Sequence, residues 1–119
     1  MAKEASYNRV VKYLNPDESQ DLSNMVLTKI SGRRKEPKTR IFKFTENAIF
    51  YKDENDQELK GTIPAETLQG VSSRTPDGFF FVHTRKFHKG GYRLGTQYEG
   101  DYERFKAIVK CLMRDAGTI

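Results

Sequence analysis

The chain has 119 residues, the length of one domain, and combines 36% hydrophobic with 31% charged residues. Eight Phe and six Tyr make it too aromatic for a disordered protein, and a single cysteine, Cys111, excludes an internal disulfide. No apolar run approaches the ~20 residues that span a bilayer, so we expect a cytoplasmic protein that meets membranes only at its surface.

The N-terminal residues 3–14 are predicted to form a short amphipathic helix. Its apolar stripe follows the i, i+3, i+4, i+7 rule and consists of Tyr7, Val10, Val11 and Leu14. Pro16 ends the helix, because proline disfavours helical geometry in the residue before it. Residues 1–24 are therefore assigned to a helix and a polar linker, and we expect the stripe to dock on the domain or on a protein partner.

From Met25 onwards the hydrophobic period changes to two, which indicates β-strands. Gly, Pro and Asn mark turns between the alternating runs. Seven strands are predicted, at 25–30, 40–44, 48–52, 58–63, 69–73, 79–84 and 92–97, with turns at 31–37, 45–47 and 75–78. Short strands at hairpin spacing favour a small sandwich or barrel.

The last segment is predicted to be an amphipathic helix. Its apolar stripe steps by three or four residues through Tyr102, Phe105, Val109, Leu112 and Ala116. Asp101 suits an N-cap or first-turn position and Gly117 suits the C-terminal cap. The predicted folded domain therefore covers residues 25–117.

The positive charge is concentrated in one hairpin. The segment from Lys29 to Arg40 holds six basic residues and one acidic residue, Glu36, so its charge of +5 equals that of the whole chain. The basic residues are Lys29, Arg33, Arg34, Lys35, Lys38 and Arg40. Such a concentration favours an anionic partner, although strand lysines also serve simply as solvated residues that prevent aggregation.

The layout of seven strands followed by a C-terminal helix resembles pleckstrin homology (PH) domains. The run from Lys38 to Tyr51 resembles their second and third strands, and the run from Leu59 to Leu68 resembles the fourth strand and its exit. The likeness is closest to the phosphoinositide-binding cytohesin type and covers about residues 25–116. The helix lacks the tryptophan usual in this family, and we expect Phe105 to fill that place.

The resemblance implies a set of phosphate-binding residues. Lys29, Lys38 and Arg40 match the basic pattern of the first two strands in these domains. Tyr51 and Lys60 match phosphate-contacting residues of the third and fourth strands. The loop residues Arg33, Arg34 and Lys35 would then face the membrane, where basic groups add about 1 kcal/mol each against an anionic leaflet.

Other chemistries find little support in the sequence. There is no nucleophile–base pair, P-loop or dinucleotide fingerprint, so we expect no enzyme and no cofactor. Asp53, Glu54 and Asp56 lack EF-hand spacing, and His83 reads as a structural residue, so no metal site is expected.

The sequence therefore predicts a membrane-targeting module that binds phosphoinositide or phosphatidic acid headgroups. The alternative is a PH-like protein-interaction or scaffold domain without specific lipid binding. Nucleic acid is a less favoured partner, because aromatic stacking pairs at RNA-module spacing are missing.

Overall fold

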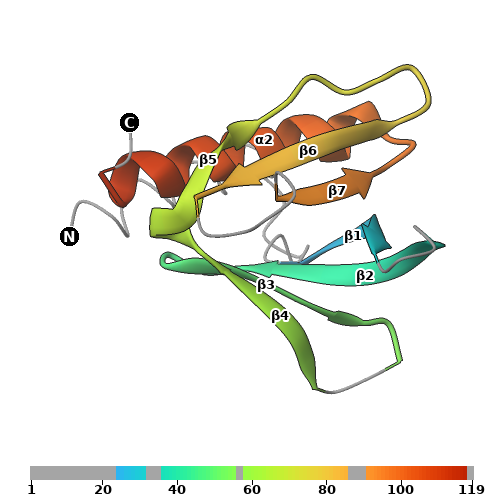
Figure 1. Cartoon of the computed structure of the whole chain (residues 1–119), viewed down its shortest axis with the longest axis horizontal. Helices are drawn as coiled ribbons and strands as arrows, with labels where there is room; N and C mark the ends of the chain where they lie inside the picture. Colours follow the sequence, from blue (N-terminus) through green and yellow to red (C-terminus); the bar gives the residue numbers. More distant parts are fainter. Residues whose placement is uncertain (1–23, 32–35, 56–57, 86–90, 118–119) are drawn as a thin grey trace, which may run out of the picture.

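The computed structural model describes residues 24–31, 36–55, 58–85 and 91–117. The helix expected over residues 3–14 and the loop residues Arg33, Arg34 and Lys35 lie outside this part of the chain. The described residues form seven strands, a 3₁₀ turn and one α-helix (Figure 1). The elements are β1 (Asn24–Ser31), β2 (Glu36–Phe44), β3 (Ala48–Asp53), β4 (Leu59–Pro64), η1 (Ala65–Thr67), β5 (Leu68–Val71), β6 (Phe79–Thr84), β7 (Tyr92–Gly95) and α2 (Glu99–Asp115).

All seven strands belong to one antiparallel sheet, in the order β4-β3-β2-β1-β7-β6-β5. β1 pairs with both β2 and β7, and it therefore joins the two halves of the sheet. In Figure 1 β2, β3 and β4 lie in a lower layer, and β5, β6 and β7 lie in an upper layer with α2 along it. The predicted seven-stranded sheet with a C-terminal helix is thus confirmed.

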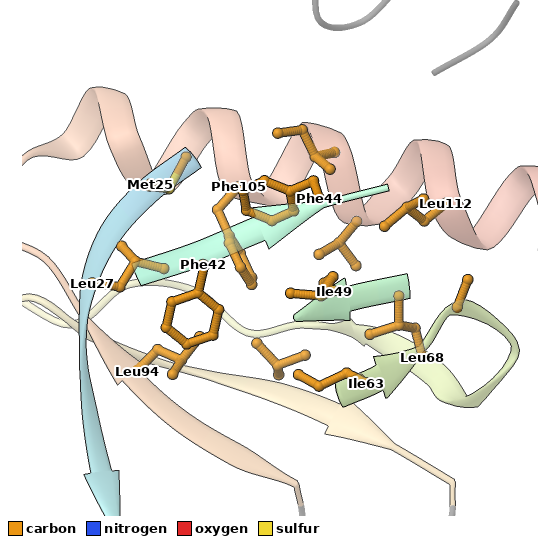
Figure 2. Close-up of a cluster of buried hydrophobic side chains, with 14 of the residues drawn as sticks. Met25, Leu27, Phe42, Phe44, Ile49, Ile63, Leu68, Leu94, Phe105 and Leu112 are labelled. Carbon is orange, nitrogen blue, oxygen red and sulfur yellow. The ribbon is translucent and has the colours of Figure 1, made fainter. Parts of the chain in front are cut away.

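The core lies between the sheet and α2, and it combines aliphatic side chains with a cluster of aromatic ones (Figure 2). Phe105 of α2 is fully buried and contacts the rings of Phe42, Phe44 and Phe80 at centroid distances of 5.5 to 6.3 Å. Edge-to-face and tilted contacts of this kind suit the aromatic quadrupole. Phe105 therefore joins aromatic side chains of β2 and β6 to α2 in the core.

The predicted ends of several elements need correction. Glu36 and Pro37 belong to β2 and not to the turn, because Pro37 stands opposite Ile30 in the ladder with β1. β7 ends at Gly95 instead of Gln97, and β5 ends at Val71 instead of Ser73. These differences reflect strand pairing, which local sequence patterns do not determine.

Candidate functional site

The inner face of β1, β2 and β3 is apolar at one end and charged at the other. Along β2 the buried Phe42 and Phe44 share a face with Arg40 and Lys38, because alternate residues of a strand point to the same side. From Phe44 towards Lys38, the side chains on this face change from buried and aromatic to basic. The charged end forms the candidate site.

Lys29 and Lys38 are directly opposite each other on β1 and β2. Lys38 is exposed, whereas Lys29 is half-buried. Burial, and then the nearby charge of Arg40, lower the pKa of Lys29 below its usual value. Because opposite residues of an antiparallel pair point to the same side, an anion bound at this end of the sheet would face both lysines.

Two tyrosine rings hold the ammonium group of Lys29. Its Nζ lies 5.2 Å from the ring centroid of Tyr51 on β3 and 5.6 Å from that of Tyr92 on β7. The two rings are 6.0 Å apart, and their side chains are hydrogen-bonded. Tyrosine phenols are protonated at neutral pH, and burial raises the pKa of both Tyr51 and Tyr92 further. Both rings therefore offer Lys29 a neutral, electron-rich face.

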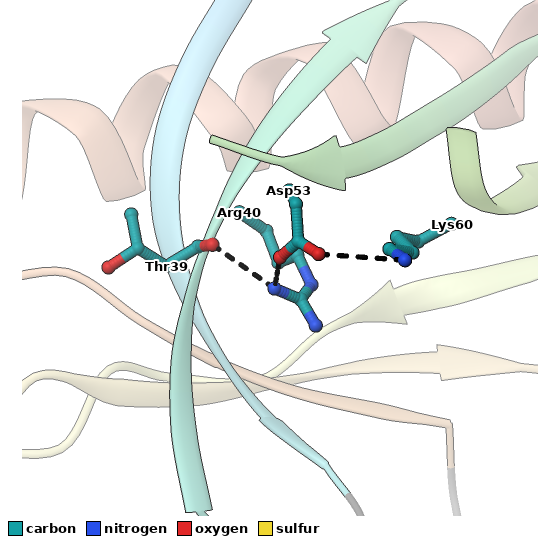
Figure 3. A network of polar contacts seen from close by, with 4 residues as sticks. All are labelled: Thr39, Arg40, Asp53 and Lys60. Atoms are coloured by element: carbon teal, nitrogen blue, oxygen red, sulfur yellow. Dashed lines mark hydrogen bonds and ion pairs between the residues drawn. The ribbon is translucent and has the colours of Figure 1, made fainter. Parts of the chain in front are cut away.

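Arg40 is held by an acidic partner that the sequence analysis did not assign to the site. Its Nη1 donates to Oδ1 of Asp53, which is its cross-strand neighbour on β3, and to the Thr39 carbonyl oxygen at 3.3 Å (Figure 3). Lys60 Nζ of β4 lies 3.6 Å from the other carboxylate oxygen of Asp53. Asp53 therefore lies between two of the cations expected to bind phosphate.

An open hollow of about 550 Å³ lies over this region. Its lining combines basic, acidic and neutral polar side chains, namely Lys38, Thr39, Arg40, Asp53, Glu54 and Asn55. Of the five described residues predicted for the site, Lys29 is the register partner of Lys38 and contacts the Tyr51 ring. The other two, Arg40 and Lys60, pair with the Asp53 carboxylate. Of these five residues, only Lys38 and Arg40 line the hollow itself.

Sequence reasoning missed Asp53 and Tyr92. Asp53 could have been found, because the turn at 45–47 pairs Phe44 with Ile49 and the same register places Arg40 opposite Asp53. Tyr92 could not, since its approach to Lys29 depends on pairing between β1 and β7, which are about 60 residues apart in the chain.

The described residues contain no group of three or more His, Cys, Asp or Glu side chains arranged to hold a metal ion. Within the same part of the chain, no helix is long and apolar enough to cross a membrane.

Comparison with known proteins identifies the fold. No family model matches the sequence, and no curated protein sequence matches it. Among solved structures, the N-terminal PH domain of human ARAP2 is similar at 20% identity and a TM-score of 0.61, over 82% of this chain and 86% of that one. The PH domain of PfAPH is 10% identical with a TM-score of 0.66, over 98% and 96% of the two chains.

The Slm1 PH domain in complex with inositol 4-phosphate is also similar, at 14% identity and a TM-score of 0.60 over 78% of this chain and 95% of that one. At these identities the likeness concerns the backbone fold. The chain therefore has the PH domain fold, as the resemblance in its sequence implied.

Proposed function

We propose that this PH-fold domain is a membrane-targeting module that binds the phosphates of an anionic lipid headgroup, a phosphoinositide or phosphatidic acid. The headgroup would lie at the open end of the sheet, between Lys29, Lys38, Arg40 and Lys60. Tyr51 would line the site, and the loop residues Arg33, Arg34 and Lys35 would meet the leaflet.

This proposal rests on four cations that β1, β2 and β4 contribute to one end of the sheet, two of which, Arg40 and Lys60, pair with the Asp53 carboxylate. A protein rarely gathers cations in this way without anionic partners, because their mutual repulsion opposes folding. A phosphorylated headgroup supplies several negative charges and needs donors from several directions, which adjacent strands provide. The Slm1 complex gives a PH-fold precedent for binding an inositol phosphate.

The test compares two lysines of the same strand. Lys38 and Lys43 are both exposed on β2, but their odd spacing places them on opposite faces. Lys38→Gln and Lys43→Gln therefore remove the same charge from the site face and from the other face. Each variant would be sedimented with vesicles of phosphatidylcholine alone, or containing phosphatidic acid or phosphatidylinositol 4-phosphate.

We expect Lys38→Gln to weaken binding to the anionic vesicles and Lys43→Gln to leave it close to wild type. Equal losses in both variants would mean that binding follows total charge and not this site. Absence of wild-type binding to every anionic vesicle would contradict the proposed function.

A groove on another side of the molecule favours the second candidate function, protein interaction. It has a volume of about 230 Å³, lies between β5 and α2, and is lined mostly by apolar surface from Gln69, Gly70, Val71, Lys106, Val109, Lys110 and Met113. Among the described strands β5 is an edge of the sheet. An edge strand beside an apolar groove suits an extended peptide, and Lys106 and Lys110 favour acidic residues in it.

Lys110→Glu, which reverses an exposed charge at this groove, tests the second candidate. The variant should lose binding to a library of acidic extended peptides while keeping wild-type binding to anionic vesicles. A wild-type domain that selects no peptide from the library would remove this candidate.

A further inference from the structure

Asp53 is the only carboxylate among the described residues with an ion pair to Arg40, and it also pairs with Lys60. The Arg40 side chain is only 12% exposed, and the Asp53 side chain is 36% exposed. Figure 3 shows the two cations on different sides of the carboxylate. One oxygen of Asp53 faces Arg40 and the other faces Lys60, so the carboxylate bridges β2 and β4 much as a phosphate group would.

This placement has an electrostatic consequence for any anion that enters the hollow. Arg40 and Lys60 share the one negative charge of Asp53, whereas Lys29 and Lys38 are register partners on β1 and β2. Among the described residues neither lysine forms an ion pair with a carboxylate, so a first phosphate can bind beside them without competing with one. A second phosphate that seeks Arg40 and Lys60 meets a like charge, and it must compete with Asp53 for the guanidinium group.

We infer that Asp53 is a specificity-determining internal anion, which occupies the Arg40–Lys60 subsite and disfavours a second phosphate on the headgroup. The inference rests on the proposed function, because it concerns the selectivity of the same site. It assigns Lys29 and Lys38 to the first phosphate. The domain would accordingly bind a headgroup with one phosphate, such as that of phosphatidic acid, at least as well as one with two, such as the inositol 1,4-bisphosphate group of phosphatidylinositol 4-phosphate.

The neighbouring residue provides a matched control. Glu54 lines the same hollow and is exposed. Asp53→Asn and Glu54→Gln each remove one negative charge from that hollow and keep the side-chain size. Only Asp53→Asn removes the bridge between Arg40 and Lys60. The probes are inositol 1-phosphate and inositol 1,4-bisphosphate, titrated into each protein by calorimetry, with vesicle sedimentation in parallel.

We expect Asp53→Asn to raise the affinity for inositol 1,4-bisphosphate about three- to fivefold, in the upper part of the range for one exposed charge interaction. Its affinity for inositol 1-phosphate should change less than twofold. Glu54→Gln should change both affinities by less than twofold. Thermal melting checks folding, and Asp53→Ser removes the same charge if the asparagine variant melts early.

Three results would overturn the inference. Equal gains in bisphosphate affinity from Asp53→Asn and Glu54→Gln would mean that the total charge of the hollow, and not the position of Asp53, sets the affinity. Equal gains for the two probes would remove the selectivity, and weaker bisphosphate binding in Asp53→Asn would mean that the carboxylate only positions Arg40. If neither wild type nor any variant binds a probe or an anionic vesicle, the proposed function itself fails.

Discussion

The ammonium nitrogen of Lys29 lies 5.2 Å from the centre of the Tyr51 ring, in a site that also contains Lys38 and Arg40. Tyr92 holds the same ammonium group from β7, so the contact spans both halves of the sheet. The cation–π contacts offset part of the cost of half-burying the charge. They hold the Lys29 ammonium group in place although burial and Arg40 lower its pKa.

Lys29→Met should weaken vesicle binding without lowering the stability of the fold. Methionine keeps the apolar stem against the tyrosine rings and removes a charge that burial and Arg40 disfavour. We expect the denaturant midpoint to stay level or rise, while sedimentation with phosphatidic acid vesicles decreases. A lower midpoint together with unchanged vesicle binding would show that Lys29 has a purely structural role.

Tyr92 should make the domain sensitive to alkali. Burial, and then Tyr51, raise its pKa in the folded state, so above about pH 10 the unfolded chain loses this proton first. Stability contributed by Tyr92 is then lost as pH rises, because the folded state binds more protons. Lys29 has the opposite effect, since a lowered lysine pKa makes stability increase with pH in its own titration range.

The Tyr92 contribution can be isolated with Tyr92→Phe. Urea unfolding at about pH 9 and pH 11 should show a smaller loss of stability in the variant than in wild type. The readout is the difference in the free energy of unfolding between the two pH values. Loss of the hydrogen bond between Tyr92 and Tyr51 lowers that free energy at both values and so cancels in the difference. Identical losses in the two proteins would contradict the raised pKa of Tyr92.

The position of the Tyr51 ring should depend on the absence of a side chain at Gly61. These residues pair between β4 and β3, and a Cβ atom on residue 61 would overlap the phenol end of Tyr51. Gly61→Ala should therefore displace the ring from Lys29 and weaken vesicle binding, with a small effect on the core. The aromatic resonances of Tyr51 report the displacement by NMR. Gly100→Ala, where nothing lies within 4 Å of the added atom, serves as the control.

Two adjacent phenylalanines should differ sharply in their contribution to stability. Phe80 is 1% exposed and contacts Phe105 and Tyr102, whereas Phe81 is 39% exposed on the outer face. Phe80→Ala should lower the free energy of unfolding by about 3–5 kcal/mol. Phe81→Ala should lower it by about 1 kcal/mol or less. Chemical denaturation of both variants measures the difference, and similar losses would contradict the assigned strand faces.

Local patterns in the sequence were sufficient for much of this fold. The turn signal at 75–78 and the aromatic run that follows it located β6 at its observed bounds, Phe79–Thr84. Helical spacing located α2, and Gly117 follows it with a φ of +76°, a conformation that glycine adopts without strain. Asp101 lies in the first turn, where it pairs with Arg104, and the N-cap is Tyr98.

The basic hairpin was also visible in the sequence, because charge counts need no structure. The register of one hairpin places Asp53 opposite Arg40, but only the tertiary structure decided that two tyrosine rings meet Lys29 and that Asp53 also meets Lys60. The ring of Tyr92 reaches Lys29 because β1 pairs with β7, and Lys60 reaches Asp53 because β4 pairs with β3. Composition and periodicity determine which residues are buried and which are charged, but partners on different strands depend on register and strand order, which the whole core sets together.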